Sequence, residues 1–535
     1  MSESTSGGSD GVNPELIFGL VGPLGADLEL VGVELTEALR QVGYDIETIP
    51  VSRLMCELKK EPWKSLPERG PEDKRLESYM DAGNALRKAV GRADALALLA
   101  IGAIREQRES RLKSSGSSGR GTAFILRSLK TPEEVRILKR IYGPTFFLIS
   151  AYAPRQKRVR NLAKRIADSN FSQRIDEFIG LAEGLVTRDE KEAEAGQKWG
   201  QNVLETFPLA DVIVNIGNPP SLRTSLVRFV QLIFGNPFHT PSRDEQGITL
   251  AFGAALRSGS LARQVGAAIC REDGSVIAIG TNEVPRPGGG LYWAGHENDG
   301  RDFLSRRDSS DAMREKILAD IIDRLSNAGW LADERKNARI QDLVKECLRE
   351  GDPPVMKGAV FLATIDYVRA VHAEMASLMD AARHGVSTVG GVLYTTTFPC
   401  HDCAKHIIAA GIRRVVYVEP YPKSLVQDFY RDSVLVDSEE KCSPKVQFEP
   451  FVGVGPTRFE DLFRLGDKKR KNKDGTVAVW RATEARAHLV GYVPSSVARL
   501  AAEREEIHRF QSRMTERGLW EEPQRRSNDT SEGLA

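Results

Sequence analysis

The chain has 535 residues, with 75 Lys and Arg against 74 Asp and Glu, so its formal net charge is +1. This length allows two or three domains, and a charge near zero excludes a general attraction to nucleic acid or membrane surfaces. No apolar run reaches the roughly 18 residues of a membrane span, and the polar start "MSESTSGGSDG" does not have the pattern of a signal peptide. We therefore expect a cytoplasmic protein that makes no membrane contact.

The first part of the chain, residues 12–236, alternates short apolar runs with stretches of helical spacing. The expected buried strands are residues 16–22, 93–102, 121–129, 145–153 and 211–218, and the expected helices are residues 28–43, 131–143, 155–168 and 221–237. Such alternation predicts a parallel sheet covered by helices.

The segment "FGLVGPLGAD" carries Gly19, Gly22 and Gly25 between a strand and a helix. Glycines in this place let backbone amides approach a phosphate, so the segment is a candidate phosphate-binding loop. The lysine and hydroxyl residue of a working P-loop are missing, because Ala26 and Asp27 follow the last glycine. A β/α domain with Gly-rich turns and no phosphate site is the alternative.

A basic stretch after residues 145–153 carries Arg155, Arg158 and Arg160 and is similar to the arginine-bearing lid of nucleotide kinases. We interpret residues 12–236 as a P-loop kinase-like domain that does not transfer phosphate and instead regulates the rest of the chain. Its expected partner is a nucleotide effector or an inhibitory partner.

The second domain is expected at residues 237–465. Residues 248–258 have helical spacing, and residues 264–283 form two strands around a Glu-Asp-Gly turn, which predicts a hairpin. After an insertion at 285–357, helical and apolar stretches alternate again, which predicts a three-layer α/β/α domain. Residues 466–535 are expected to be a charged C-terminal extension that is partly disordered.

Two short motifs in this domain indicate a metal site. Cys400 and Cys403 stand three residues apart at the expected start of a helix, which brings both sulfurs to one face and favours the thiolate that binds metal. Because no second CxxC is present, a four-cysteine structural site is disfavoured, and His372 is the expected third ligand. Three ligands leave a coordination position for water, which is typical of catalytic zinc. A redox pair at the cysteines, with a core histidine at 372, is the alternative.

Glu374 lies two residues after His372 and is the candidate catalytic acid and base. Residues two apart in mid-helix point about 200° away from each other. The pair is therefore expected where the chain enters a helix.

The pattern H-x-E…P-C-x-x-C is the signature of zinc nucleobase deaminases. With "RQVGAAI", "GTNEVP" and "VVYVEPYPKS", residues 240–465 resemble the cytidine and deoxycytidylate deaminase family, in particular its dCMP branch. The resemblance implies a Zn²⁺ cofactor, a deoxycytidine nucleotide substrate and a sugar contact from Asn282. Lys423 and the arginines of the insertion are expected to favour a phosphorylated substrate, and a homo-oligomer is expected. His296 in the insertion is expected at the surface, with a metal or substrate contact as the alternative.

A kinase-like domain joined to such a deaminase resembles the bacterial anti-phage deaminases that act on dCMP and dCTP and lower the deoxycytidine nucleotide pool. The expected function is hydrolytic deamination of dCMP or dCTP to dUMP or dUTP. The alternative is an RNA- or DNA-editing cytidine or adenosine deaminase, which would need a basic channel for the strand. A non-enzymatic sensor is disfavoured because all four site residues are present.

Overall fold

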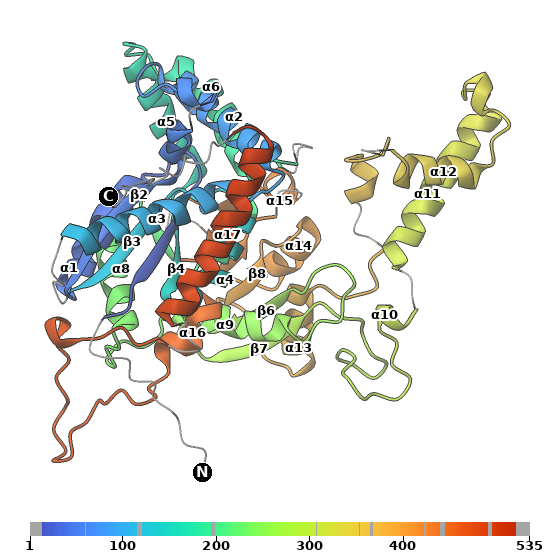
Figure 1. The fold of residues 1–535 in the computed structure, drawn as a ribbon. Coiled ribbons are helices and arrows are strands. Elements are labelled where there is room, and N and C mark those ends of the chain that lie inside the picture. The colour runs from blue at the N-terminus through green and yellow to red at the C-terminus, as the bar shows by residue number, and fades with distance from the viewer. Residues whose placement is uncertain are drawn as a thin grey trace, which may run out of the picture. The chain divides into compact units, whose positions relative to one another are not determined.

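The computed structural model describes residues 13–58, 60–114, 120–193, 198–305, 308–351, 354–363, 367–421, 424–438, 444–489 and 495–519. They form two compact units, unit 1 with Met1–Ser242 and Val452–Ala535, and unit 2 with Arg243–Phe451 (Figure 1). The polar start of the chain, Lys423 and residues 520–535 lie outside the described residues. No helix in the described part is both long and apolar enough to cross a bilayer.

Unit 1 is built on a sheet with the strand order β12-β5-β4-β1-β3-β2. The five strands from β5 to β2 pair in parallel, and only β12 is antiparallel. The expected parallel sheet is thereby confirmed. The strands are β1 (Leu16–Val21), β2 (Tyr44–Pro50), β3 (Gly121–Arg127), β4 (Phe146–Tyr152), β5 (Val212–Asn215) and β12 (Gly453–Val454).

Helices surround this sheet. They are α1 (Leu28–Gln41), α2 (Glu72–Val90), α3 (Ala95–Ser114), α4 (Pro132–Tyr142), α5 (Arg155–Ser169), α6 (Ile179–Lys191), α7 (Val203–Thr206), α8 (Pro219–Ile233), α16 (Pro456–Phe463) and α17 (Ser496–Glu516), with the 3₁₀ helix η1 (Val51–Glu57). The strand expected at 93–102 is wrong, because these residues begin α3. Ala97, Ala100, Ile101 and Ile104 are all fully buried, which is the spacing of one helical face. A short apolar run cannot be assigned to strand or helix by periodicity alone.

The end of the chain completes unit 1, which corrects the expected domain boundary at residue 465 and the expected separate extension at 466–535. Strand β12 pairs with β5, and Arg458 of α16 donates to the carboxylate of Asp211, which is 1% exposed. The same carboxylate accepts from the backbone N–H of Leu148 in β4 at 2.7 Å. Asp211 therefore ties two strands to the C-terminal segment, and unit 2 is an insertion within the chain of unit 1.

Helix α17, drawn in red in Figure 1, packs against α2, α3 and α4 of unit 1. Glu503 on α17 is fully buried and accepts two hydrogen bonds from Arg108, at 2.8 and 3.0 Å. Glu506 accepts from Arg92 and Arg140 at 3.1 and 2.7 Å. Truncating one partner of such a buried pair typically costs about 3–5 kcal/mol. The helix is therefore an integral part of the first unit.

Unit 2 is built on a sheet with the order β10-β11-β9-β8-β6-β7. The expected hairpin is confirmed, because β6 pairs antiparallel with β7, and β6 also pairs antiparallel with β8. The pairs β8–β9, β9–β11 and β11–β10 are parallel. The strands are β6 (Gly266–Cys270), β7 (Val276–Thr281), β8 (Val392–Thr397), β9 (Arg414–Glu419), β10 (Val434–Val436) and β11 (Val446–Pro450).

Two glycines show that helices cover both faces of this sheet. A Cβ on Gly266 would lie 1.9 Å from the carbonyl oxygen of Ala251 in α9 (Arg243–Ala255), and one on Gly280 would lie 2.2 Å from that of Ala373 in α13 (Ala373–Arg383). Gly280 is paired with Ala267, the neighbour of Gly266, so the two glycines face opposite sides. Helix α14 (His401–Ala409) contacts α13. The unit is therefore a three-layer α/β/α sandwich.

The expected insertion between β7 and α13 contains α10 (Asp302–Ser305), α11 (Ser309–Asn327) and α12 (Ile340–Arg349). Helices α11 and α12 form the yellow pair in Figure 1. Leu318 and Ile322 of α11 pack with Leu343 and Val344 of α12 in a small separate core. A further short helix, α15 (Val426–Phe429), follows β9.

Candidate zinc site

His372 and Glu374 lie where the chain enters α13, as expected from their spacing. His372 is the N-cap, with φ −66° and ψ 153°, and Glu374 is the second residue of the helix. The extended backbone of the cap removes the mid-helix geometry that would turn the two side chains apart. Both side chains therefore lie at the N-terminal end of α13.

Cys400 and Cys403 occupy the first turn of α14. Cys400 is the N-cap, and its sulfur accepts the backbone N–H of Cys403 at 3.3 Å. Strand β8 ends three residues earlier, at Thr397, so the sheet fixes where this turn begins. Both cysteines are buried in the hydrophobic core of the unit. The sequence-predicted position of the pair at a helix start is confirmed.

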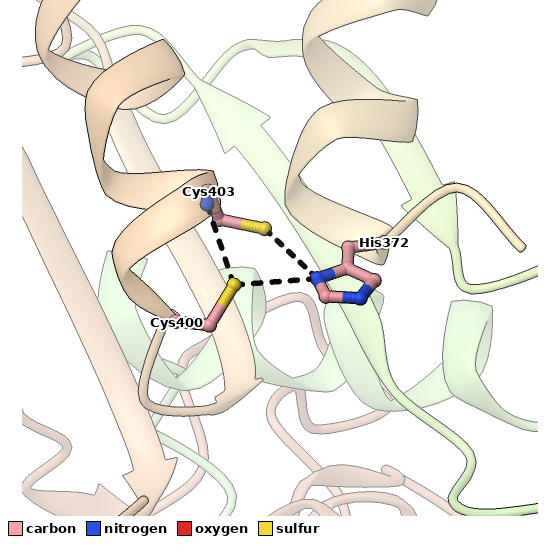
Figure 2. Close-up of side chains that lie close together, drawn as sticks. All are labelled: His372, Cys400 and Cys403. Carbon is pink, nitrogen blue, oxygen red and sulfur yellow. Dashed lines mark hydrogen bonds between the residues drawn. The ribbon is translucent and has the colours of Figure 1, made fainter. Parts of the chain in front are cut away.

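The three predicted ligands converge on one point, as Figure 2 shows. The Nδ1 atom of His372 lies 3.3 Å from the sulfur of Cys403 and 3.4 Å from that of Cys400. A tetrahedral zinc with ordinary bond lengths separates a nitrogen from a sulfur ligand by about 3.6 Å, so the donors are already spaced for the ion. Within the described part of the chain, no other group of three or more such side chains converges. Two thiols and one imidazole fit Zn²⁺ and leave one coordination position free.

Without metal, protons are distributed unequally over this cluster. The pKa of Cys400 is lowered, first by a hydrogen bond from Cys403 and then by His372, against the effect of burial. The pKa of Cys403 is raised by its hydrogen bond with Cys400 and by burial. The hydrogen bond with Cys400 raises the pKa of His372 to about 9, although burial opposes it. Because zinc ligands must be deprotonated, metal uptake is expected to release protons.

Glu374 is the buried acid of the site, with only 4% of its surface exposed. Burial and the nearby Cys400 thiolate raise its pKa to about 7 in the metal-free protein. A hydrogen bond with Cys403 acts in the opposite direction and shows how close the carboxylate lies to the ligands. A carboxyl group that titrates near neutrality can both accept and return a proton.

Asn282 lies beside the same helix entry, because its neighbour Glu283 forms a β-bridge with Val371, the residue before His372. Its amide oxygen accepts from the N–H of Val265 at 2.8 Å, and its amide nitrogen donates to the carbonyl of Arg263 at 2.7 Å. Both ends of the side chain are thus used to hold the segment before β6. A sugar contact from Asn282 stays a prediction.

His296 does not join the cluster. Its Nδ1 accepts the N–H of Trp293 at 3.0 Å, and its Nε2 lies 2.9 Å from the guanidinium of Arg286. Both ring nitrogens therefore serve the loop of the insertion, and the interpretation as a metal ligand has no support among the described residues.

Sequence analysis assigned no role to Tyr421 or Arg263, and it included Arg314 only among the arginines of the insertion. The pKa of Tyr421 is raised by burial and by the Cys400 thiolate, and Arg263 and Arg314 act to lower it. Both guanidinium groups are paired with carboxylates, Arg263 with Glu419 and Arg314 with Asp311. Arg263, Arg314 and Tyr421 come from the segment before β6, from α11 and from the segment after β9, so sequence spacing gave no signal of their proximity.

The glycines of the candidate phosphate loop lie in unit 1 and do not form one group. Gly19 lies inside β1, where a Cβ would be 2.7 Å from the side chain of Leu129. Gly22 and Gly25 follow β1 and line a cavity of that unit. Gly19 therefore serves strand packing, and only the other two belong to the loop.

A His-Cys-Cys set with one open position and an adjacent buried glutamate defines a class, the zinc-dependent hydrolytic deaminases. Residues 241–419 match the model of the family described as the cytidine and deoxycytidylate deaminase zinc-binding region. The family match and the donor set agree on Zn²⁺ as the cofactor.

Several proteins are similar to parts of the chain. Deoxycytidylate deaminase of Enterobacteria phage T4 is 37% identical over 106 residues, which are 19% of this chain and 55% of that protein. ComE operon protein 2 of Bacillus subtilis is 45% identical over 53 residues, which are 10% of this chain and 28% of that protein. The chain therefore spans about half the length, or less, of these relatives.

Two solved structures show a weaker likeness. The dCMP deaminase of cyanophage S-TIM5 in complex with dCMP and dUMP is 19% identical, with a TM-score of 0.22, over 40% of this chain and 99% of that one. A structure from a study of tRNA:A34 deaminases is 17% identical, with a TM-score of 0.19, over 39% of this chain and 100% of that one. Likeness of this degree establishes neither a fold nor a substrate.

Proposed function

We propose that the protein is a zinc-dependent deaminase that hydrolyses deoxycytidine nucleotides, dCMP or dCTP, to dUMP or dUTP and ammonia. The observation that carries the proposal is the convergence of His372, Cys400 and Cys403 beside the buried carboxylate of Glu374. The family match of residues 241–419 and the deoxycytidylate deaminases among the similar proteins support it.

In this proposal Glu374 moves the protons of the reaction. Zinc held by the three ligands is a Lewis acid that lowers the pKa of a water molecule. Glu374 takes one proton from the attacking water and delivers it to the ring nitrogen N3, and it then carries the second proton from the C4 hydroxyl to the amino group, which leaves as ammonia. One C4–O bond forms, one C4–N bond breaks, and the carboxylate returns to its starting state. Burial of Glu374 keeps bulk water from competing for this proton.

The expected substrate carries a phosphate. Arg263 and Arg314 both act on the pKa of Tyr421. Arg263 is paired with Glu419 and Arg314 with Asp311, so a substrate phosphate would compete with these carboxylates for charge-assisted hydrogen bonds from the guanidinium groups. One such bond contributes about 1.5–3 kcal/mol, which corresponds to about a ten- to hundredfold preference over an unphosphorylated nucleoside.

A substrate panel tests this proposal on the full-length protein. We expect ammonia release from dCMP or dCTP to exceed that from deoxycytidine by at least about tenfold in kcat/KM. Equal rates on deoxycytidine and its phosphates would contradict the phosphate contact. Faster release from single-stranded RNA or DNA than from any free nucleotide would favour an editing enzyme instead.

We also propose that the deaminase lowers the deoxycytidine nucleotide pool of bacterial cells during phage infection and that unit 1 regulates it. The resemblance of the two-domain arrangement to bacterial anti-phage deaminases supports this role. The proposed site of action is the cytoplasm, and the proposed active form is a homo-oligomer. In phage-infected bacterial cells that produce the wild-type protein, the measured dCTP pool should fall. In infected cells that produce the Glu374→Gln variant, it should not fall.

A further inference from the structure

Unit 1 contains a cavity of about 870 Å³ that has no part in the zinc chemistry. Its walls come from the loop after β1, η1, α2, the end of β3 and α5. Strand β1 lies between β3 and β4 in the sheet. The strands β3 and β2 lie on one side of β1, and β4 and β5 lie on the other side, so the strand order reverses at β1. Ligands of open α/β sheets bind at the carboxyl ends of the strands where the strand order reverses. Cavities of about 300–1,000 Å³ fit small-molecule ligands.

The glycine loop at this cavity is already occupied by a carboxylate of the protein itself. Asp189 of α6 is fully buried, and its carboxylate accepts from the N–H of Leu24 at 2.7 Å and from Lys130 Nζ at 2.8 Å. Lys130 also donates to the carbonyl of Gly22 at 3.2 Å. An N–H of the loop and the nearest ammonium group, the donors that would bind a phosphate, are therefore both used by Asp189.

Gly25 is required by the backbone conformation of the loop and by its close approach to α5, and not by phosphate binding. Its φ is +85°, and a Cβ there would lie 2.4 Å from the carbonyl oxygen of Arg158 in α5. The guanidinium of Arg158 in turn bonds Glu190 of α6 at 2.7 Å. The loop is thus closed against α5 and α6 and forms a wall of the cavity.

Other cations of the cavity remain available for a ligand. Arg75 and Arg165 are paired with Glu72, and Arg87 is paired with Glu134. In contrast, Arg53 and Lys164 line the cavity, are exposed, and have no ion pair or hydrogen bond with the described part of the chain.

The same wall offers acceptors and an aromatic ring. Glu68 and Asp168 line the cavity and have no cationic partner among the residues described. Tyr79 lines it as well, beside Arg53 and under the guanidinium of Arg75 at 5.8 Å. Cations for phosphate, carboxylates for sugar hydroxyls and a ring for a base are the groups that nucleotide sites combine.

Two strained or unsatisfied features support a ligand in this place. Ser128, on the cavity wall, has a φ of +83°, a conformation that costs a non-glycine residue free energy and is concentrated at functional sites. Arg87, also on the wall, is 2% exposed, and its Nε has no hydrogen-bond partner. A buried donor without a partner is rare unless a ligand or water completes the site.

We propose that this cavity binds a nucleoside phosphate, with the phosphate on Arg53 and Lys164 and not in the glycine loop, which Asp189 closes. The site lies in unit 1 and does not depend on the deaminase function. It gives the proposed regulatory role of that unit a ligand class and a location. A ligand there can change the deaminase only if it binds two states of the protein with different affinity.

Calorimetric titration of the full-length protein with thymidine triphosphate, adenosine triphosphate and inorganic pyrophosphate tests the proposal. These probes have no cytosine amino group, so the proposed deamination does not consume them. We expect saturable binding of at least one triphosphate and no binding of thymidine. Arg53→Ala combined with Lys164→Ala should weaken it at least about tenfold. The matched control combines Lys88→Ala and Arg136→Ala, exposed residues of α2 and α4 outside the cavity wall, and it should bind as the wild type does.

Three results would overturn the proposal. The first is no saturable binding of any probe, and the second is equal affinity in the wild type and the Arg53/Lys164 double variant with both proteins folded by circular dichroism. The third concerns Asp189→Asn, which removes the charge that competes for the loop. A gain of about tenfold or more in that variant would place the phosphate in the loop.

Discussion

Replacement of Glu374 by glutamine is expected to lower kcat for dCMP deamination by a factor of about 10²–10⁴, the usual contribution of a positioned proton carrier. Glutamine keeps the size of the side chain and part of its hydrogen bonding, but it cannot accept and return the proton. Because Glu374 is not among the three ligands, the variant should retain one zinc per chain by elemental analysis. Initial rates of dUMP formation measure the loss.

Glu272→Gln is the matched control, because Glu272 lies in the turn between β6 and β7 with a side chain that is 78% exposed. It should deaminate dCMP at the wild-type rate. If Glu374→Gln kept more than about 1% of the activity with full zinc occupancy, the assignment of proton transfer to Glu374 would be wrong.

Cys400→Ser is expected to remove the metal and, with it, both activity and part of the stability of the protein. Serine presents a neutral hydroxyl where zinc needs a thiolate. A metal present at a thousand times its Kd stabilises the folded state by about 4.1 kcal/mol, so its loss should be visible as a lower Tm. Zinc content and the thermal unfolding curve are measured on the same preparation.

Cys347→Ser serves as the control because Cys347 lies in α12 of the insertion and is not part of the cluster. It should keep zinc and Tm. Full zinc occupancy in Cys400→Ser would exclude Cys400 from the ligand set, whatever happened to the rate.

The zinc ligands could be predicted from sequence because each half of the site is local. His372 and Glu374 share the start of α13, and Cys400 and Cys403 share the start of α14. Such spacings report side-chain proximity within one turn. The positions of Arg263 and Arg314 near Tyr421 depend on how separate elements pack, so no local pattern indicated them.

Which segments of the chain make up unit 1 could be predicted only in part. Four of the five parallel strands follow from the alternation of apolar and helical stretches, and β2 (Tyr44–Pro50) was missed. The pairing of Arg108 with Glu503 joins residues 395 positions apart. Sequence periodicity carries no information on such a contact. One consequence is practical, since a fragment starting at residue 236 would keep α17 without the helices that bury it. Residues 243–451 are the fragment that matches unit 2.

The candidate phosphate loop shows the same limit. The sequence correctly indicates that no lysine follows Gly25. It does not reveal that Lys130 reaches the loop from the segment after β3 or that Asp189 reaches it from α6. The absence of the P-loop lysine from the sequence therefore did not show whether the loop could still accept a phosphate. The contacts of Asp189 with Leu24 and Lys130 show that a carboxylate of the protein occupies this position.

The most direct test of the central claim is the fate of dCMP in heavy-oxygen water, H₂¹⁸O, with the purified zinc-loaded protein. The account predicts dUMP that carries a single heavy oxygen from water, formed together with one equivalent of ammonia, and no product with Glu374→Gln. Mass spectrometry of the nucleotide reads both the conversion and the label. Absence of conversion of dCMP and dCTP by protein with full zinc occupancy, or product without the label, would contradict hydrolytic deamination at this site.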